Sequence, residues 1–67
     1  MLAIETERET DGRWIAEVAA LPGGMAYGET EPEARDKIKA LALRVIADRL
    51  EHGEPLPPEL TGLFETA

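Results

Sequence analysis

Two alternating segments joined by a short loop decide the fold: LAIETERE (residues 2–9), TDG (residues 10–12) and RWIAEV (residues 13–18). In each flanking segment, larger or apolar residues alternate with charged ones. Period-two alternation is typical of a strand with one buried face. The Asp-Gly pair between the segments is a hairpin signal. The sequence therefore predicts two antiparallel strands in its first 18 residues.

The length of the hairpin loop follows from matching the two faces. A two-residue loop would set the charged face of one strand against the apolar face of the other, because a one-residue slip turns every side chain over. A three-residue loop, residues 10–12, pairs Thr6 with Ala16, and the apolar faces then coincide. It also places Glu5 opposite Glu17, which a solvated face tolerates. We therefore predict a type I turn with a left-handed glycine bulge.

A third short strand follows the turn LPGG (residues 21–24), where proline fixes φ and glycine can take positive φ. Its residues, 25–28, put Met25 and Tyr27 on one face. The other face carries only small side chains: Gly24, Ala26 and Gly28. Small residues let another element approach the backbone closely. We expect that element to be the following helix.

The helix has clear start and stop signals. Thr30 can cap its N-terminus, and Glu33 three residues later completes a capping box. Arg49 and His52 suit the last turns, and Gly53 suits the position after the end. An apolar stripe at helical spacing runs along it, made of Ala34, Ile38, Leu41, Ala42 and Val45.

The stripe widens towards the C-terminus through Leu43, Ile46 and Leu50. Two explanations stay open. Either the sheet and the C-terminal tail cover all of it, or its flank meets a second subunit, since larger apolar patches usually mark interfaces. The subunit-interface candidates are these three residues and, in the tail, Leu63 and Phe64.

The chain is predicted to be a single α+β domain over residues 1–67, with a three-stranded antiparallel sheet and one helix on one face. Residues 2–53 form the β-β-β-α core. Residues 54–59 are proline-rich and predicted to be extended, and residues 60–67 form either a short edge strand or a tail that packs on a surface. A chain this short is marginally stable, and it has no cysteine to cross-link. We therefore expect a dimer or higher homo-oligomer.

The net charge is −7, from 14 acidic and 7 basic side chains. This charge opposes direct binding to nucleic acid, which depends on Lys and Arg. It suits a basic protein partner, although it also serves solubility. The basic residues of the helix are interspersed with Asp36 and Asp48 and form no basic patch. No signal segment or membrane span is expected, and a cytoplasmic location fits the lack of cysteine.

Little in the composition supports catalysis, metal binding or a cofactor. There is no serine or cysteine nucleophile, and His52 suits a helix end better than a metal site. The candidates for binding are the exposed strand carboxylates Glu5, Glu7 and Glu17. We interpret them as contacts for a partner protein. The alternative is a small-ligand or metal-dependent role for the same three carboxylates.

The ordered set DGRWIAEV (residues 11–18), LPG (21–23), AYGET (26–30) and Glu33-Ala34 resembles the N-terminal domain of HicB-type antitoxins. This resemblance covers residues 2 to about 58. It implies a partial RNase H-like fold, with β-β-β-α order and a short fourth strand, and no nuclease activity. It also implies a partner, a small basic HicA-type toxin that cleaves RNA and is neutralised by being covered. Such antitoxins usually continue into a DNA-binding segment, and this sequence ends at Ala67, so we expect no operator binding of that kind.

Overall fold

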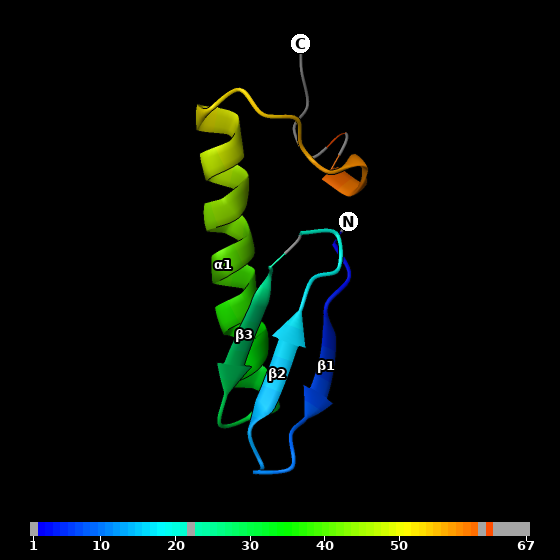
Figure 1. Ribbon diagram of the computed structural model, residues 1–67, viewed down its shortest axis with the longest axis vertical. Helices are drawn as coiled ribbons and strands as arrows, with labels where there is room; N and C mark the ends of the chain where they lie inside the picture. The colour runs from blue at the N-terminus through cyan, green and yellow to red at the C-terminus, as the bar shows by residue number, and fades with distance from the viewer. Residues whose placement is uncertain (1, 22, 61, 63–67) are drawn as a thin grey trace.

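The computed structural model describes residues 2–21, 23–60 and 62, and its elements follow the order β-β-β-α (Figure 1). The strands form one antiparallel sheet in the order β1-β2-β3. The predicted α+β class is therefore confirmed. The element bounds are β1 (Glu5–Arg8), β2 (Trp14–Glu17), β3 (Met25–Gly28), α1 (Glu31–Glu51) and a 3-10 turn, η1 (Pro58–Leu60).

The hairpin between β1 and β2 has the predicted register. Thr6 lies opposite Ala16, and Glu5 lies opposite Glu17. The loop closes with the Glu9 N–H donating to the Arg13 carbonyl at 2.7 Å. Its glycine, Gly12, has a φ of 91°, as the left-handed bulge position requires.

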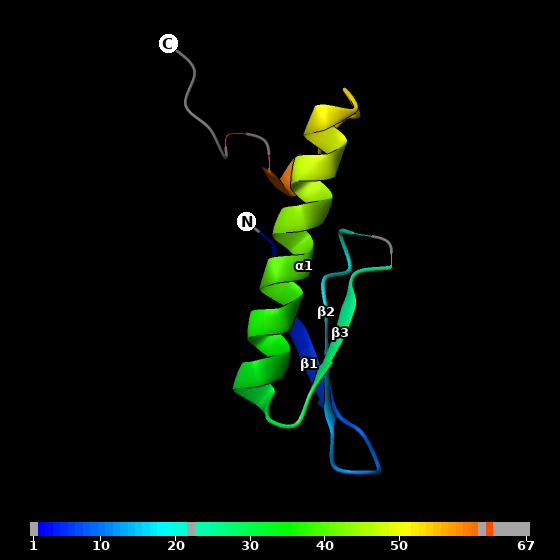
Figure 2. The same cartoon turned by 90° about the vertical axis from the view of Figure 1, so that its left-hand side faces the viewer.

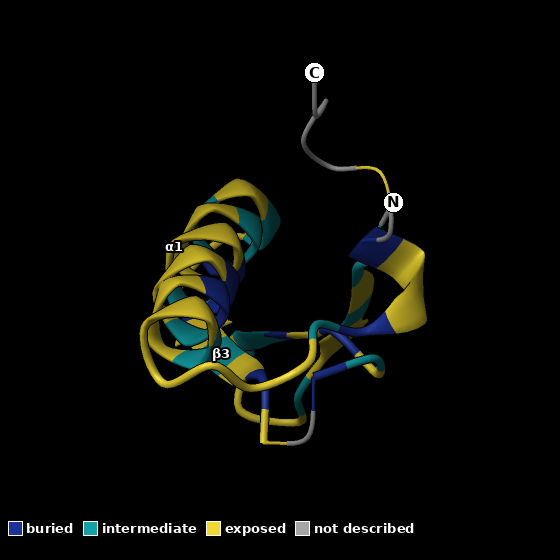
Figure 3. Cartoon of the chain, turned by 90° about the horizontal axis from the view of Figure 1, so that it is seen from above, coloured by how far each residue is buried: buried dark blue, intermediate teal, exposed yellow. Residues whose placement is uncertain are grey.

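The core lies between α1 and one face of the sheet. Seen from above, the helix occupies one side of the sheet only, and its buried positions point towards the strands (Figure 3). The strands and the turn after β2 contribute buried Ala16, Val18 and Leu21. The helix contributes Ala34, Ile38 and Ala42. Many of these side chains are small, so the helix and the sheet approach each other closely.

The closest approach is at Gly28, at the end of β3. A Cβ atom added there would lie 2.5 Å from the Ala34 backbone nitrogen and 3.0 Å from the Ala34 Cα. Real Cβ atoms do not approach backbone that closely. The predicted contact between the small-residue face of β3 and the helix is therefore confirmed, and glycine is the residue that permits it.

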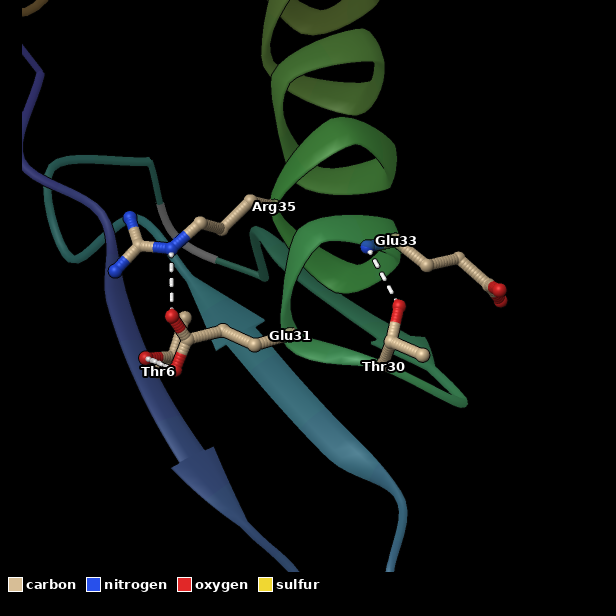
Figure 4. Close-up of polar contacts among 5 residues, drawn as sticks. All are labelled: Thr6, Thr30, Glu31, Glu33 and Arg35. Atoms are coloured by element: carbon tan, nitrogen blue, oxygen red, sulfur yellow. Dashed lines mark hydrogen bonds and ion pairs between the residues drawn. The ribbon is translucent and has the colours of Figure 1, made fainter.

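Both helix ends are capped. Thr30 Oγ1 accepts a hydrogen bond from the Glu33 N–H at 3.2 Å (Figure 4). Glu33 Oε1 accepts from the Glu29 N–H at 3.4 Å, one residue before the Thr30 position expected of a capping box. At the other end the Gly53 N–H donates to the Leu50 carbonyl and the Glu54 N–H to the Arg49 carbonyl, at 3.2 and 2.8 Å. This pair of bonds is a Schellman motif, with Gly53 at a φ of 69°.

The helix is much longer than the strands (Figure 2). Its 21 residues span about 32 Å, whereas the four-residue strands span about 13 Å.

After the helix, residues 54–57 have no regular structure, and Pro58–Leu60 form a 3-10 turn rather than the extended chain predicted to residue 59. Proline is compatible with the first position of a helical turn, where its missing N–H is not needed. The possible fourth strand at residues 60–67 lies mostly outside the described residues. No helix among the described residues is long and apolar enough to cross a membrane.

The Gly28→Ala substitution tests the close approach. We expect the free energy of unfolding to fall by about 1–3 kcal/mol, because the added methyl group overpacks against the Ala34 backbone. Urea denaturation monitored by circular dichroism measures the change. The control is Ala19→Val at an exposed loop position, which should stay within about 0.5 kcal/mol of the wild type. A neutral Gly28→Ala variant would contradict the contact.

The helix start also makes stability depend on pH. Glu33 Oε1 lies 3.1 Å from Lys37 Nζ, and the lysine, with the Glu29 N–H, holds the pKa of the Glu33 carboxyl below its ordinary value of 4.5. Ionised Glu33 therefore adds stability that is complete above pH 4.5 and is lost as the pH falls through the lower folded-state pKa. We expect Glu33→Gln, and more weakly Lys37→Met, to flatten the acid limb of the melting temperature plotted against pH. An unchanged acid limb in Glu33→Gln would contradict this role.

Candidate functional site

The candidate site is the face of the sheet that α1 leaves uncovered. Side chains alternate along each strand, and those on the face that does not carry Ala16 and Gly28 point away from the helix. They come from all three strands: Glu5 and Glu7 from β1, Ile15 and Glu17 from β2, and Met25 and Tyr27 from β3. We call these six residues the open face.

Strand register sorts the open face into two rows. One row is Glu5, Glu17 and Met25, and the other is Glu7, Ile15 and Tyr27. Directly paired residues have Cβ atoms about 5 Å apart. The structure thus brings together the three carboxylates selected from the sequence, around a shallow hollow of ≈ 260 Å³. Residues lining this hollow are Glu5, Thr6, Glu7, Glu9, Ile15, Glu17 and Met25.

The apolar part of the open face is exposed. Met25 keeps 45% and Tyr27 42% of its surface accessible, and Ile15 is half-buried. The Arg13 guanidinium lies over the Tyr27 ring, 5.0 Å from its centroid. Tyr27 therefore lies between the open-face carboxylates and the positive charge of Arg13, and part of its ring is accessible.

Asp11 largely neutralises that positive charge. Arg13 Nε donates to Asp11 Oδ2 at 2.8 Å, and the Arg13 N–H donates to Asp11 Oδ1 at 3.0 Å. The Arg13 backbone bond and then its guanidinium lower the pKa of the Asp11 carboxyl. Sequence reasoning missed this Asp11–Arg13–Tyr27 arrangement. The register between β2 and β3 produces it, because that register sets Trp14 opposite Gly28 and brings their neighbours Arg13 and Tyr27 together.

The open face has a strongly negative charge. Within the part of the chain that the structure describes, Glu5, Glu7, Glu9 and Glu17 have no ion-pair partner. The ion pairs of the described residues lie in the hairpin loop and along the helix instead. The carboxylates at the open face are therefore unpaired and available to a cationic partner.

The remaining polar candidates have structural roles. Thr6 Oγ1 donates to Glu31 Oε2 at 3.3 Å, and Arg35 Nε donates to Glu31 Oε1 at 3.3 Å, so Glu31 ties the helix to β1 (Figure 4). His52 lies at the helix end, its Nδ1 2.8 Å from the Asp48 carbonyl oxygen, as expected. Among residues 2–21, 23–60 and 62, no three His, Cys, Asp or Glu side chains lie close enough to hold a metal ion.

The subunit-interface candidates divide into two groups. Leu43 and Leu50 are exposed, at 66% and 48%, as an interface requires. Ile46 does not fit, because only 6% of it is exposed and it continues the buried stripe of the helix within one chain. Leu63 and Phe64 lie outside the described residues. The exposed apolar flank of the helix therefore includes Leu43 and Leu50 but not Ile46, and it is narrower than the three-residue flank predicted from the sequence.

Comparison of the chain with protein-family models, with curated proteins and with solved structures finds no match. The resemblance to HicB-type antitoxins therefore stays a prediction from sequence motifs. The structure itself shows the β-β-β-α order and the open acidic face.

Proposed function

We propose that this chain is an antitoxin-type protein-binding module, without catalysis of its own, that covers a small basic protein with its open face. The observation that carries the proposal is the group of unpaired carboxylates around half-buried Ile15 and exposed Tyr27. Complementary charge speeds encounter with a basic partner and rejects acidic ones. Exposed aromatic and aliphatic side chains in the same patch supply area that a partner can bury.

The chemistry of the open face suits Lys and Arg side chains. Glu5 and Glu17 lie directly opposite each other, so one guanidinium can reach both. Tyr27 offers a ring face to a second cation, as it already does to Arg13. A partner rich in basic residues would therefore find both charge and stacking in one patch.

The size of the open face limits how it is used. Three four-residue strands cover roughly 13 by 14 Å. That is well below the roughly 800 Å² that each partner buries in a standard interface. The contact must therefore extend over the hairpin loop or past a strand edge.

The resemblance to HicB-type domains supports the identity of the partner. It implies a HicA-type toxin that cleaves RNA, a basic protein whose RNA-binding surface an acidic domain can cover. It also implies a cytoplasmic complex, since RNA-cleaving toxins act there. The net charge of −7 agrees with this role.

Charge reversal on the open face tests the proposal. The probe is the small basic protein encoded by the adjacent gene, titrated calorimetrically at physiological ionic strength. We expect the Glu5→Lys/Glu17→Lys variant to bind about 100-fold more weakly or worse, since it loses two charge-assisted contacts. The same variant should no longer rescue growth when the probe is expressed.

The matched control is Asp36→Lys/Glu54→Lys, which changes the net charge equally but away from the sheet. Its affinity should stay within about threefold of the wild type. Equal loss in both variants would show that only net charge matters. A neighbouring gene that encodes no basic protein, or a basic neighbour that does not bind, would contradict the antitoxin role.

A further inference from the structure

Strand β3 forms one edge of the sheet, and the backbone groups of Tyr27 point out of that edge. The Val18 N–H donates to the Gly24 carbonyl at 3.0 Å, so this pair is hydrogen-bonded. Bonded and non-bonded pairs alternate in an antiparallel ladder, and Ala26 and Gly28 therefore bond to β2. The Tyr27 N–H and carbonyl consequently face outward, and no turn, loop or cap hydrogen bond among the described residues uses them.

A hollow of ≈ 500 Å³ lies beside the same edge, between β3 and α1. The helix contacts β3 more extensively than it contacts β1, and in Figure 1 it lies on the β3 side of the sheet. Within the described residues, β3 is the last strand on this side, so the helix has no further strand beneath it there. We call the hollow the edge groove, and its lining residues are Met25, Ala26, Lys37, Ala40, Leu41 and Arg44.

The edge groove has room for a single strand but not for a second copy of this chain. The Ala34 backbone lies against Gly28, so α1 lies directly over β3. Strands paired across this edge are about 4.8 Å apart, and a second copy would bring its own helix axis about as close to α1. Packed helices need about 8–10 Å between their axes. A strand that carries no helix avoids this overlap, because only its side chains enter the groove.

We propose that the edge groove binds an extended peptide segment of another protein, which adds to β3 as a fourth strand and carries an apolar residue two positions before an Asp or Glu. The segment runs antiparallel to β3, the direction that the rest of the sheet already has. One of its residues exchanges two hydrogen bonds with the outward N–H and carbonyl of Tyr27. The next residue lies opposite Ala26 and points towards the helix, because side chains alternate along a strand.

The floor of the edge groove suits an apolar side chain at the position opposite Ala26. Ala26 and Leu41 are half-buried, and Ala40 is exposed. None of these three side chains has a hydrogen-bonding group to offer. An aliphatic peptide side chain therefore covers apolar surface there, at about 25 cal/mol per Å² removed from water, whereas a polar one loses its bonds to water.

The next peptide side chain on the helix side lies beside Arg44. Gly28 is level with Ala34, and the helix runs back along the strand from there. Gly24 is four residues before Gly28, a distance of about 13 Å, which equals about nine residues of helix. The peptide residue opposite Gly24 is therefore level with residue 43, next to Arg44.

Arg44 favours a carboxylate at this position. It forms no ion pair within the described part of the chain. The other basic residue of the groove, Lys37, is already paired, with its Nζ 3.1 Å from Glu33 Oε1. A guanidinium binds a carboxylate through two parallel hydrogen bonds. An Asp or Glu two positions after the apolar residue thus meets the unpaired charge of the groove.

The edge groove and the open face are different surfaces with opposite charge preferences. Tyr27 contributes its ring to the open face and its backbone to the groove. The peptide site therefore does not depend on the proposed function, and it can bind its segment whether or not a basic partner covers the open face.

Titration of the full chain with a synthetic peptide tests the proposal. The probe is the acetylated, amidated hexapeptide Thr-Thr-Leu-Thr-Glu-Thr, followed through amide chemical shifts in two-dimensional NMR. We expect saturable binding, large shifts around Tyr27 and Arg44, and slower hydrogen exchange of the Tyr27 amide, which gains a hydrogen-bond partner. Absence of saturable binding up to about 1 mM peptide would overturn the proposal.

A charge exchange tests the contact with Arg44. Arg44→Gln should weaken binding about tenfold, and Arg44→Glu should weaken it further. A probe with Lys in place of Glu should recover the affinity in the Arg44→Glu variant. The matched control is Lys39→Gln, which removes the same charge from a helix residue outside the groove lining. Its affinity should stay within about twofold of the wild type.

Tyr27→Pro tests the strand pairing, because it removes the outward N–H without breaking a bond to β2. It should abolish binding, and the charge exchange at exposed Arg44 keeps the test decisive if this variant fails to fold. Equal affinity of the wild type and both Arg44 variants would contradict the peptide site. So would a dimer of the chain alone, seen by sedimentation velocity, that Arg44→Glu dissociates, because a second copy would then fill the groove.

Discussion

The contact between the Gly28 backbone and the start of the helix at Ala34 is the constraint on which the other features depend. It places the helix against the β3 side of the sheet, at a distance that only a residue without a side chain allows. The chain then has only Glu29 and Thr30 with which to turn from strand into helix. Thr30 can therefore cap the helix, and the apolar stripe from Ala34 onward faces the sheet.

Docking the helix on one face leaves the opposite face uncovered, and the sequence places its charge accordingly. The helix compensates its own charges through pairs such as Arg35–Glu31 and Lys37–Glu33. Among the residues that the structure describes, none forms an ion pair with Glu5 or Glu17 on the open face. Uncompensated carboxylates, Glu5, Glu7 and Glu17, thus lie on the face of the sheet that α1 leaves uncovered.

Local patterns predicted the parts of the fold that depend on neighbours in sequence. Alternation gave the hairpin register, small residues at Gly24 to Gly28 gave the helix contact, and Thr30 and Gly53 gave the helix ends. Ile46, named as a subunit-interface candidate, is buried within one chain, and the sequence does not say what covers the far end of the helix. The Arg13–Tyr27 contact was missed because it joins two strands that no local pattern aligns. The carboxylate pair at Glu5 and Glu17 was predicted, since hairpin register alone defines it.

The small core explains why surface left uncovered matters in this chain. Of its eight buried apolar residues among those described, Ala16, Ala34 and Ala42 have side chains of a single methyl group. Burying a methyl group contributes much less than burying a leucine or phenylalanine side chain. Meanwhile Met25 and Tyr27, two of the largest apolar side chains on the sheet, stay about half exposed. The close packing that the alanines and Gly28 permit thus limits the apolar area that one chain buries in its core.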